Sequence, residues 1–287
     1  MSKVIEQALH MAGDSSPIKQ IRQSFGGSIN ESFFVETDER IYFVKYHNNA
    51  PERFFELEAK GLELIRETNT ISVPEVLAYS DEKNNAFLVM EWVEGQKAPD
   101  TEYKLGERIA AMHQTVGERH GFTDDTFIGI LPQPNGLFSS WLEYYRDQRL
   151  AAQLEMGATQ GSIKGKRRTR LEKLLANLEK WVPDNVEPSY LHGDLCGGNW
   201  LVGAAGNPYV IDPSFLYGDR HFELAFTELF GGYSRDFYQA YQERFPLADY
   251  YETIKPLYQL YYLLVHLNIF GEPYGPRVDA VLKQYIE

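Results

Sequence analysis

The stretch that decides how this chain is interpreted is Tyr190–Trp200, which reads YLHGDLCGGNW. Two short polar residues, Asp194 and Asn199, lie five residues apart within it, and three glycines surround them. Glycine permits a tight turn and allows a ligand to approach the backbone closely. Two interpretations stay open on this stretch alone: a turn without function, or a loop that presents two polar side chains.

Two short apolar runs follow this loop and predict a β-hairpin. They are Trp200–Val202 and Tyr209–Ile211, and a glycine-containing segment with one proline separates them. Asp212 follows the second run directly, so the pairing of the two runs would place it beside Asn199. An amide oxygen and a carboxylate that converge in this way suit Mg²⁺. Asp194, one loop away, would be free to receive or orient a hydroxyl proton.

A lysine and a glutamate in the first part of the chain predict a buried ion pair. Lys45 ends a predicted strand, and Glu58 lies on the apolar stripe of a helix predicted over residues 51–67, four residues after Phe54 and four before Leu62. A carboxylate on a buried helix face needs a partner, and a lysine from the adjoining strand is the obvious candidate. The alternatives are an exposed lysine at a strand end and a glutamate that bends outward into solvent.

A short glycine loop precedes these two residues. It consists of Gly26, Gly27, Ser28, Ile29 and Asn30, between two segments predicted to be extended. Such a loop can fold over phosphate groups with its backbone N–H groups, although a plain hairpin turn is the alternative. It is not a Walker A loop, because no Gly-Lys-Ser/Thr follows, and it lacks the GxGxxG pattern of dinucleotide-binding folds.

The predicted elements divide the chain into a strand-rich first part and a mainly helical second part. The first ninety residues predict one helix, over residues 51–67, and strands over 32–37, 40–46 and 86–90. The helices predicted after them cover residues 102–116, 141–156, 167–181 and 250–270. Glycine, proline and charged residues cluster near 93–100, which is typical of a boundary between lobes.

We therefore predict an α+β fold with two lobes and a ligand site between them. The first lobe, residues 1–94, has a small antiparallel sheet, and the second, residues 95–287, is larger and helical. In chain order, the glycine loop, the strand lysine, the helix glutamate, Asp-x₄-Asn and the final Asp resemble the parts that protein-kinase-like folds use for phosphoryl transfer. The usual Asp-Phe-Gly is absent, and Ile211–Pro213 takes its place.

The composition argues against several classes of partner. The chain has 287 residues and a formal net charge of −13, so it repels the phosphate backbone of nucleic acids and anionic membrane surfaces, and we expect neither as a partner. No run of apolar residues is long enough to predict a membrane span, and the first residues lack the pattern of a secretion signal. The single cysteine, Cys196, excludes an intrachain disulfide and fits a reducing compartment, so a cytoplasmic location is expected.

The chain as a whole resembles the fructosamine kinases, or ketosamine 3-kinases. His192–Asn199 reads HGDLCGGN and is similar to the HGDLWSGN signature of that family. Ile211–Ala225 reads IDPSFLYGDRHFELA and resembles its IDPAxxYGDREx-D/E-LA segment, and Leu257–Gly271 resembles its C-terminal helix. Shorter matches to its small lobe lie at 26–30, 43–45 and 58–62. The pattern HGDx₄N alone is shared with aminoglycoside and choline kinases, so the second and third segments are the specific ones.

This resemblance implies ATP-dependent phosphorylation of the sugar 3-hydroxyl of a ketosamine. The acceptor would be a fructosamine, ribulosamine or erythrulosamine, free or on a glycated protein lysine, and the reaction would serve deglycation. The resemblance implies that Asp194 is the catalytic base and that Asn199 and Asp212 hold Mg²⁺. It also implies that Lys45 contacts the α- and β-phosphates of ATP and pairs with Glu58.

The resemblance also implies further contacts to the two substrates, ATP and the acceptor. The hinge that meets adenine would consist of Met90, Glu91, Trp92 and Val93, and the glycine loop would cover the phosphates. The candidates for the acceptor site are His192, Cys196, Asp219 and Arg220. For the last two, a structural ion pair is an equally good interpretation.

Three positions depart from the family pattern. Cys196 stands where the family usually has Trp, Gly197 where it has Ser, and His221 where it has Glu. The smaller wall beside the base predicts a changed acceptor preference. Two other functions stay open: a kinase for another small alcohol, such as an aminoglycoside or a sugar, and a non-catalytic protein that binds a nucleotide. The sequence leaves the oligomeric state open, and a monomer is compatible with it.

Overall fold

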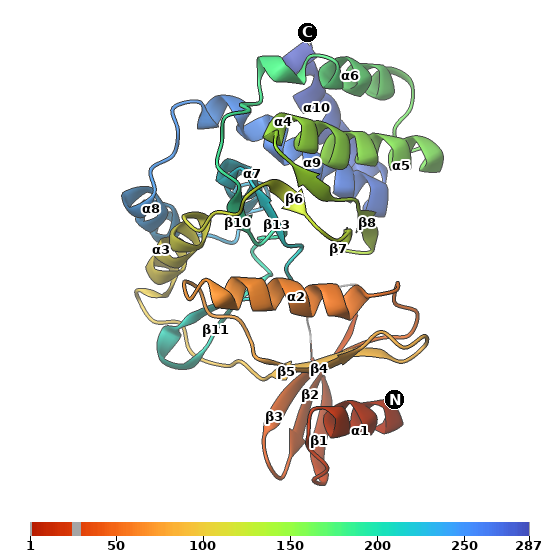
Figure 1. Cartoon of the computed structure of the whole chain (residues 1–287), viewed down its shortest axis with the longest axis vertical. Helices are drawn as coiled ribbons and strands as arrows, with labels where there is room; N and C mark the ends of the chain where they lie inside the picture. The colour runs from red at the N-terminus through yellow and green to blue at the C-terminus, as the bar shows by residue number, and fades with distance from the viewer. Residues whose placement is uncertain (1, 25–29, 287) are drawn as a thin grey trace. The chain divides into compact units, whose positions relative to one another are not determined.

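The structure of the chain, a computed structural model, describes residues 2–24 and 30–286 (Figure 1). It divides into two compact units, each built from three stretches of the chain. Unit 1 consists of Met1–Ala111, Gly198–Pro213 and Ser234–Tyr241, and unit 2 consists of Met112–Gly197, Ser214–Tyr233 and Gln242–Glu287. This division describes how compactly the residues pack and does not test the two functional lobes predicted over residues 1–94 and 95–287, which stay a prediction.

Unit 1 contains the antiparallel sheet that the sequence predicts. Within the described residues its strands are ordered β1-β2-β3-β5-β4, and each is antiparallel to its neighbours. The strands are β1 (Ile18–Ser24), β2 (Glu31–Thr37), β3 (Ile41–His47), β4 (Val76–Ser80) and β5 (Ala86–Glu91). Ser32 pairs with Lys45 across β2 and β3, which confirms the hairpin predicted there.

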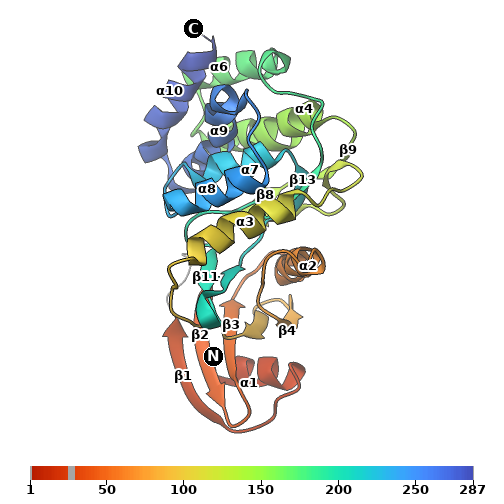
Figure 2. The ribbon, with the colours of Figure 1, turned by 90° about the vertical axis from the view of Figure 1, so that its left-hand side faces the viewer.

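Two helices cover opposite faces of this sheet (Figure 1 and Figure 2). Helix α1 (Ser2–Met11) packs its apolar side chains on the face that carries Val44. Helix α2 (Phe54–Glu67) lies on the other face, where Lys45 binds Glu58. Successive residues of a strand point to opposite faces, which is why neighbouring positions of β3 reach different helices.

The start of the chain departs from the prediction in two ways. The sequence predicts one helix in the first ninety residues, but α1 is a second one, and a helix this short depends on packing more than on its own propensity. Helix α2 begins three residues later than predicted, because Arg53 has a left-handed backbone with φ of 63°. The carboxylate of Asp81 accepts the N–H groups of Phe55 and Glu56 at 2.8 and 3.0 Å and thereby caps the start of α2.

A buried carboxylate joins the end of α1 to the sheet. Asp14 Oδ2 accepts hydrogen bonds from the hydroxyl groups of Thr37 and Tyr42 at 2.7 and 2.8 Å. Asp14 Oδ1 accepts the N–H and the hydroxyl of Ser16 at 2.8 and 2.6 Å. Burial by itself would raise the pKa of Asp14, but these hydrogen bonds outweigh it and hold the pKa well below its usual value.

Asp14→Ala is expected to lower the stability of the protein by about 2 kcal/mol at pH 7, because buried hydroxyl groups lose their acceptor. The folded pKa lies below the unfolded value of about 3.9, so the carboxylate contributes fully above that pH and loses its contribution as the pH falls through the folded pKa. Thermal unfolding at pH 7 and pH 3 should therefore show a difference in Tm between wild type and variant that shrinks at acid pH. A difference that stays constant with pH would contradict this account.

The hairpin predicted after Asn199 is confirmed and belongs to unit 1. Its strands are β11 (Trp200–Val202) and β12 (Pro208–Val210), which pair antiparallel. The N–H of Ile211 donates to the carbonyl oxygen of Asn199 at 3.0 Å, so the pairing continues one residue beyond the strands. Asp212 is the next residue, and the hairpin therefore brings the two residues that were predicted to bind a metal to the same end.

Unit 2 contains short strands that the sequence does not predict. Within the described residues, four of them form a sheet in the order β10-β13-β6-β9, and β7 pairs with β8. The strands are β6 (His120–Phe122), β7 (Thr126–Ile128), β8 (Leu131–Gln133), β9 (Gly136–Phe138), β10 (Ser189–Leu191) and β13 (Leu216–Gly218). Three residues are too few to show an alternating pattern, and the pairing of β6 with β13 joins segments that are far apart in the chain.

Most of the helical segments predicted from the sequence are helical in the structure, although the helices begin and end at different residues. Those of unit 2 are α4 (Trp141–Tyr144), α5 (Ala152–Gln160), α6 (Gly165–Leu175), α7 (Arg220–Thr227), α9 (Tyr251–Phe270) and α10 (Gly275–Ile286). A π-helix over Tyr145–Ala151 connects α4 to α5. Short 3₁₀ helices cover Leu178–Lys180, Ala204–Gly206 and Glu272–Tyr274. Helices α3 (Thr101–His113) and α8 (Arg235–Arg244) each continue from unit 1 into unit 2.

Helix α9 is the centre of the unit 2 core, where it contacts α5, α7 and α10. Its tyrosines pack against other buried rings: Tyr258 lies 6.2 Å from Trp141 and Tyr262 lies 5.0 Å from Phe222, measured between ring centroids. The helix is apolar on nearly all sides because it is buried on nearly all sides. Among the described residues, no helix combines the length and the hydrophobicity that crossing a membrane requires.

Candidate functional site

The candidates for phosphate binding in unit 1 converge on one lysine. Lys45 Nζ donates a hydrogen bond to Glu58 Oε1 at 2.6 Å and another to Asp212 Oδ1. The side chains of Lys45 and Glu58 are only 4% and 11% exposed, and that of Asp212 is 33% exposed. Strand β3, helix α2 and the end of the hairpin β11–β12 each supply one of the three residues. The predicted buried pair is therefore confirmed, and Asp212 joins it.

Burial and neighbouring charges shift the pKa values of Lys45 and Glu58 in opposite directions. Burial by itself would lower the pKa of Lys45, but the carboxylates of Asp212 and Glu58 outweigh it, so the pKa is raised and the ammonium group stays charged. Burial raises the pKa of Glu58 to about 7, while the charge of Lys45 opposes that shift and the charge of Asp212 adds to it. Lys45 thus carries a permanent positive charge that can bind phosphate oxygens as it now binds carboxylates.

The two predicted metal ligands lie at the end of the hairpin. Asp212 has a left-handed backbone with φ of 58°, which is uncommon for a residue other than glycine. Asn199 is the residue whose carbonyl oxygen binds the N–H of Ile211, directly before Asp212. A carboxylate and an amide supply the hard oxygen ligands that Mg²⁺ takes, and Mg²⁺ usually completes its shell with water and substrate phosphates. The donor set therefore fits the predicted metal.

A metal ion bound by Asn199 and Asp212 would need the phosphates of a nucleotide as further ligands. In the described part of the chain, no group of three or more His, Cys, Asp or Glu side chains is arranged to hold a metal ion. Mg²⁺ is commonly bound by one or two protein oxygen ligands together with the phosphates of a nucleotide. Asn199 and Asp212 match that pattern, whereas a site made only of protein side chains would need more ligands.

The predicted hinge begins at the end of β5. Met90 is buried and pairs with Phe43 of β3. The ring of Trp92 packs against Phe34 and Phe43, with centroids 4.9 and 6.1 Å apart. Residues two apart in a strand share a face, so these rings lie on the face of the sheet that also carries Lys45. An aromatic surface beside the lysine suits a planar base, and adenine binding here stays a prediction.

The other candidates for nucleotide binding are placed as follows. Glu91 Oε1 accepts the N–H of Glu75 at 3.1 Å, and Val93 is half-buried. Asn30 is half-buried directly before β2. The rest of the glycine loop lies outside the described residues, namely Gly26, Gly27, Ser28 and Ile29. Phosphate binding by this loop therefore stays a prediction.

The predicted base lies on a tight loop in unit 2. Asp194 is half-buried and follows Gly193, whose φ is 84°. A Cβ atom on Gly193 would lie 1.9 Å from the carbonyl oxygen of Ser214, so only glycine fits there. The N–H of Ser214 donates to the carbonyl oxygen of His192 at 2.9 Å. His192 itself is fully buried and accepts the N–H of Asp194 at Nδ1 over 3.2 Å, so it supports the loop, while acceptor contact by His192 stays a prediction.

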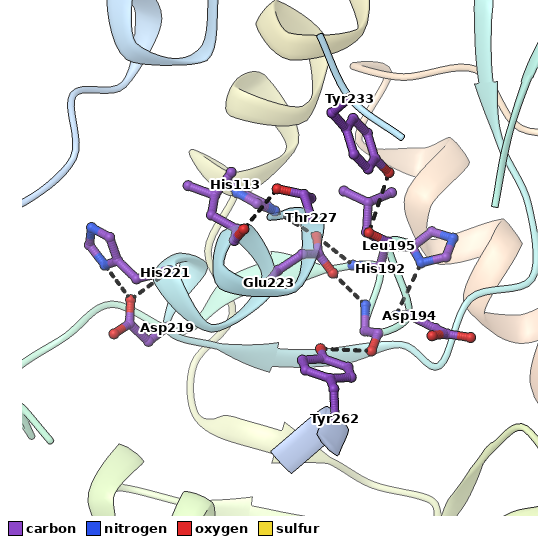
Figure 3. Close-up of polar contacts among 12 residues, drawn as sticks. His113, His192, Asp194, Leu195, Asp219, His221, Glu223, Thr227, Tyr233 and Tyr262 are labelled. Carbon is purple, nitrogen blue, oxygen red and sulfur yellow. Dashed lines mark hydrogen bonds and ion pairs between the residues drawn. The ribbon is translucent and has the colours of Figure 1, made fainter. Parts of the chain in front are cut away.

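Side chains from outside the loop bind its backbone (Figure 3). Glu223 Oε1 accepts the N–H of Gly193 at 2.5 Å. Glu223 Oε2 accepts the N–H of His192 at 3.2 Å and Nε2–H of His113 at 2.7 Å. Tyr262 donates its hydroxyl to the carbonyl oxygen of Gly193 at 3.0 Å. Helices α3, α7 and α9 therefore all contribute side chains to the support of one loop.

Glu223 stays ionised although its side chain is fully buried. Burial by itself would raise the pKa of Glu223, but the hydrogen bond and the charge of His113, together with His192 and the N–H of Gly193, outweigh it and lower the pKa. The sequence assigns no role to Glu223. Its one signal is its place in the segment 211–225, where the resembling family has Asp or Glu.

Two of the positions that depart from the family pattern follow Asp194 on the same loop, and their place as a wall beside the base stays a prediction. Cys196 is half-buried, and the hydroxyl of Tyr233 lies 3.1 Å from its carbonyl oxygen and 3.3 Å from that of Leu195. A Cβ atom on Gly197 would lie 2.7 Å from the Cα atom of Gly232. The serine that the family usually has at 197 would therefore not fit without a shift of the backbone.

The last two acceptor candidates bind other parts of the protein. Asp219 Oδ1 accepts the N–H and Nδ1–H of His221 at 3.0 and 2.7 Å, and its Oδ2 accepts the hydroxyl of Tyr258 at 2.6 Å. Arg220 donates to the carbonyl oxygen of Phe245 at 3.0 Å and lies over the ring of that residue. These contacts give both residues structural partners other than each other, and both the ion pair and acceptor binding by Asp219 and Arg220 stay predictions.

The fold and the arrangement of these residues define a kinase-like phosphotransferase. A solved structure from Haemophilus somnus 129PT, named "Putative fructosamine-3-kinase", superposes with a TM-score of 0.88 at 30% identity, over 100% of this chain and 98% of the other. An aminoglycoside phosphotransferase solved with AMP-PNP and hygromycin B shares the fold alone, with a TM-score of 0.61 at 18% identity over 97% and 98% of the two chains. The predicted α+β, protein-kinase-like fold is thereby confirmed.

Comparison of this sequence with known protein families and relatives shows the family to which the chain belongs. Residues 1–287 match the model of the fructosamine kinase family. A "Probable ketoamine kinase" from Lactiplantibacillus plantarum is 36% identical over 93% of this chain and 95% of the relative. A "Protein-ribulosamine 3-kinase, chloroplastic" from Arabidopsis thaliana is 31% identical over 96% of this chain and 85% of the relative. The chain belongs to the fructosamine kinase family, which confirms the resemblance seen in its motifs.

Proposed function

We propose that this kinase transfers the γ-phosphate of ATP to the sugar 3-hydroxyl of a ketosamine. The observation that carries the proposal is the buried Lys45, which binds Glu58 and Asp212 at once. A strand lysine held by a helix glutamate is the arrangement that kinases use to bind nucleotide phosphates. The names of the relatives, ketoamine kinase and ribulosamine 3-kinase, support the acceptor class.

The nucleotide is bound by residues of unit 1. Lys45 contacts the α- and β-phosphates, and Glu58 holds its ammonium group in place. The hinge 90–93 meets adenine, and the glycine loop 26–30 covers the phosphates. The complex of a fold neighbour with AMP-PNP supports ATP as the donor. Since ATP is abundant in the cytoplasm, we place the reaction there.

The transfer itself needs a metal, a base and an acceptor hydroxyl. Asn199 and Asp212 hold Mg²⁺, which offsets the negative charge of the phosphates when it is bound. Asp194 accepts the proton of the 3-hydroxyl as the hydroxyl oxygen bonds to the γ-phosphorus. The bond from the γ-phosphorus to its bridging oxygen breaks, and ADP leaves with that oxygen. The products are ADP and a ketosamine 3-phosphate.

The acceptor is a fructosamine, ribulosamine or erythrulosamine, either as a small amine conjugate or on a glycated protein lysine. Phosphorylation of such an acceptor is the first step in removing the sugar from the amine, so the reaction serves deglycation. The half-buried Cys196 beside the base leaves more room than the tryptophan usual in the family. We infer that this room admits a bulkier or differently shaped ketosamine.

Cys196→Trp is expected to raise the KM for bulky ketosamines roughly 10-fold, because a larger side chain fills the wall beside the base. The KM for ATP should stay within about 2-fold, since the change affects acceptor binding only. The measurement is kcat/KM for ketosamines of increasing size, with Cys196→Ser as a control that preserves the volume. An unchanged order of acceptors in the tryptophan variant would argue against a role of Cys196 in selection.

The direct test is an acceptor panel with Mg-ATP. It contains fructosyl-, ribulosyl- and erythrulosyl-lysine, a glycated protein, an aminoglycoside and a free hexose, with Asp194→Ala as the blank. We expect transfer to the 3-hydroxyl of at least one ketosamine, with the position of the phosphate assigned by phosphorus NMR. Transfer only to the aminoglycoside or to the hexose would refute the ketosamine assignment. No transfer at all, together with a rise in Tm on addition of Mg-ATP, would indicate a protein that binds the nucleotide without catalysis.

A further inference from the structure

Both carboxylate oxygens of Glu223 bind the loop that carries the base. One of its oxygens binds the N–H of Gly193, and the other binds the N–H of His192 and Nε2–H of His113. The side chains of Glu223 and His113 are both 0% exposed. Two of the three groups that bind this carboxylate are backbone N–H groups of the loop, so Glu223 acts directly on the conformation of the loop.

The other side of Gly193 is held by a tyrosine. The hydroxyl of Tyr262 donates to the carbonyl oxygen of Gly193 at 3.0 Å. The ring of Tyr262 stacks on Phe226, with centroids 3.6 Å apart and an angle of 3° between the rings. This stacking restricts the ring and fixes the position of its hydroxyl. Figure 3 shows Glu223 and Tyr262 reaching the backbone next to Asp194 from different elements, and both bind Gly193.

These contacts act on the glycine that directly precedes the base in the chain. Gly193 must be glycine, because its φ is 84° and the carbonyl of Ser214 leaves no space for a Cβ atom. Glycine has more conformational freedom than any other residue. Rotation of the peptide units on either side of Gly193 would redirect the next side chain, which is that of Asp194. Holding both the N–H and the C=O of Gly193 removes this freedom.

We propose that Glu223, supported by His113, and Tyr262 are positioning residues for Asp194. They fix the peptide units on both sides of Gly193, so that the carboxylate of the base is held in the direction that the reaction requires. Catalysis gains from such preorganisation, since a displacement of about 1 Å can cost on the order of 10²-fold in rate. The proposal rests on the proposed function, because it assigns these residues a part in the step that Asp194 performs.

The sharpest test compares two phenylalanine variants of buried tyrosines in the same core. Tyr262→Phe removes the hydroxyl that binds Gly193, and Tyr145→Phe removes a hydroxyl that binds the carbonyl oxygen of Leu257 at 2.6 Å. Both tyrosines are at most 1% exposed, and both rings pack against Phe222. A purely structural role predicts the same result for both variants, which is a lower Tm with unchanged kcat.

We expect Tyr262→Phe to lower kcat about 5- to 10-fold, the factor that one net hydrogen bond represents, with an unchanged KM for ATP. Tyr145→Phe should keep the kcat of the wild type. Glu223→Gln should lower kcat roughly 30-fold or more, because one acceptor of the loop N–H groups becomes a donor. Amide hydrogen exchange in the peptide covering residues 190–197 should be faster in Tyr262→Phe and in Glu223→Gln than in Tyr145→Phe.

Two outcomes separate this inference from the function on which it rests. A wild-type protein that phosphorylates a ketosamine, with equal kcat values for Tyr262→Phe and Tyr145→Phe, would overturn the positioning role and leave the function intact. A wild-type protein inactive toward every ketosamine would overturn the proposed function and this inference with it. If Glu223→Gln fails to fold, the pair of phenylalanine variants still decides the question, because each removes a single oxygen atom.

Discussion

Asp194→Asn is expected to lower kcat for ketosamine phosphorylation about 10²- to 10⁴-fold, which is the usual contribution of a general base. The asparagine has the same shape as the aspartate but cannot take up the proton of the acceptor hydroxyl. The contacts that hold Gly193 and His192 involve the backbone and other side chains, so the loop should keep its conformation. Steady-state kinetics with saturating Mg-ATP measures the effect.

The control for this variant is Asp249→Asn, which changes the net charge by the same amount at an exposed position of the same unit. The KM for ATP should change less than about 3-fold in Asp194→Asn, because the proposed nucleotide contacts involve other residues. A loss of less than about 10-fold in kcat would be too small for a general base and would assign Asp194 a different role.

Asp212→Asn is expected to lower kcat about 10²- to 10³-fold, as the removal of one group that stabilises the charge of a transition state usually does. Asparagine tolerates a left-handed backbone at least as well as aspartate, so the end of the hairpin should keep its conformation. Lys45 retains Glu58 as a buried partner, and the protein should therefore fold. The rate measured against Mg²⁺ concentration should reach half of its maximum at a higher concentration than in the wild type.

An exposed aspartate of unit 1 provides the matched control for this variant. Asp38 pairs only at the surface with Lys19, so Asp38→Asn makes the same chemical change away from the site. It should leave both kcat and the Mg²⁺ dependence as they are in the wild type. An Asp212→Asn protein with the wild-type Mg²⁺ dependence would show that Asp212 does not hold the metal.

The parts of the fold that follow from local patterns could be predicted from the sequence. The strands β2, β3 and β5 have recognisable runs of β-branched and aromatic residues, and α9 has a long apolar helical pattern. The three-residue strands of unit 2 have no such pattern, and their partners lie far away in the chain. Helix α1 has a readable pattern as well, because Ile5, Ala8 and Leu9 recur at helical spacing and pack on the sheet, although it is absent from the prediction above.

The candidate site was predictable to a similar extent. The pair Lys45–Glu58 follows from the spacing of apolar residues in one helix and from the position of Lys45 at the end of one strand. Asn199 and Asp212 flank two strands that pair as a hairpin, and this local pairing predicts that they lie at the same end. Glu223 could not be found in this way. Its role depends on helix α7 packing behind the loop of Asp194, and no local pattern indicates which side of a helix faces a distant loop.

The left-handed backbone of Asp212 limits how this kinase can become more stable. An L-residue in this region gives up roughly 1–2 kcal/mol relative to ordinary backbone conformations. Glycine at this position would relieve the strain but would also remove the carboxylate on which the proposed metal binding depends. A screen for thermostable variants and a screen for turnover should therefore favour different residues at position 212, so heat resistance and catalytic speed oppose each other there.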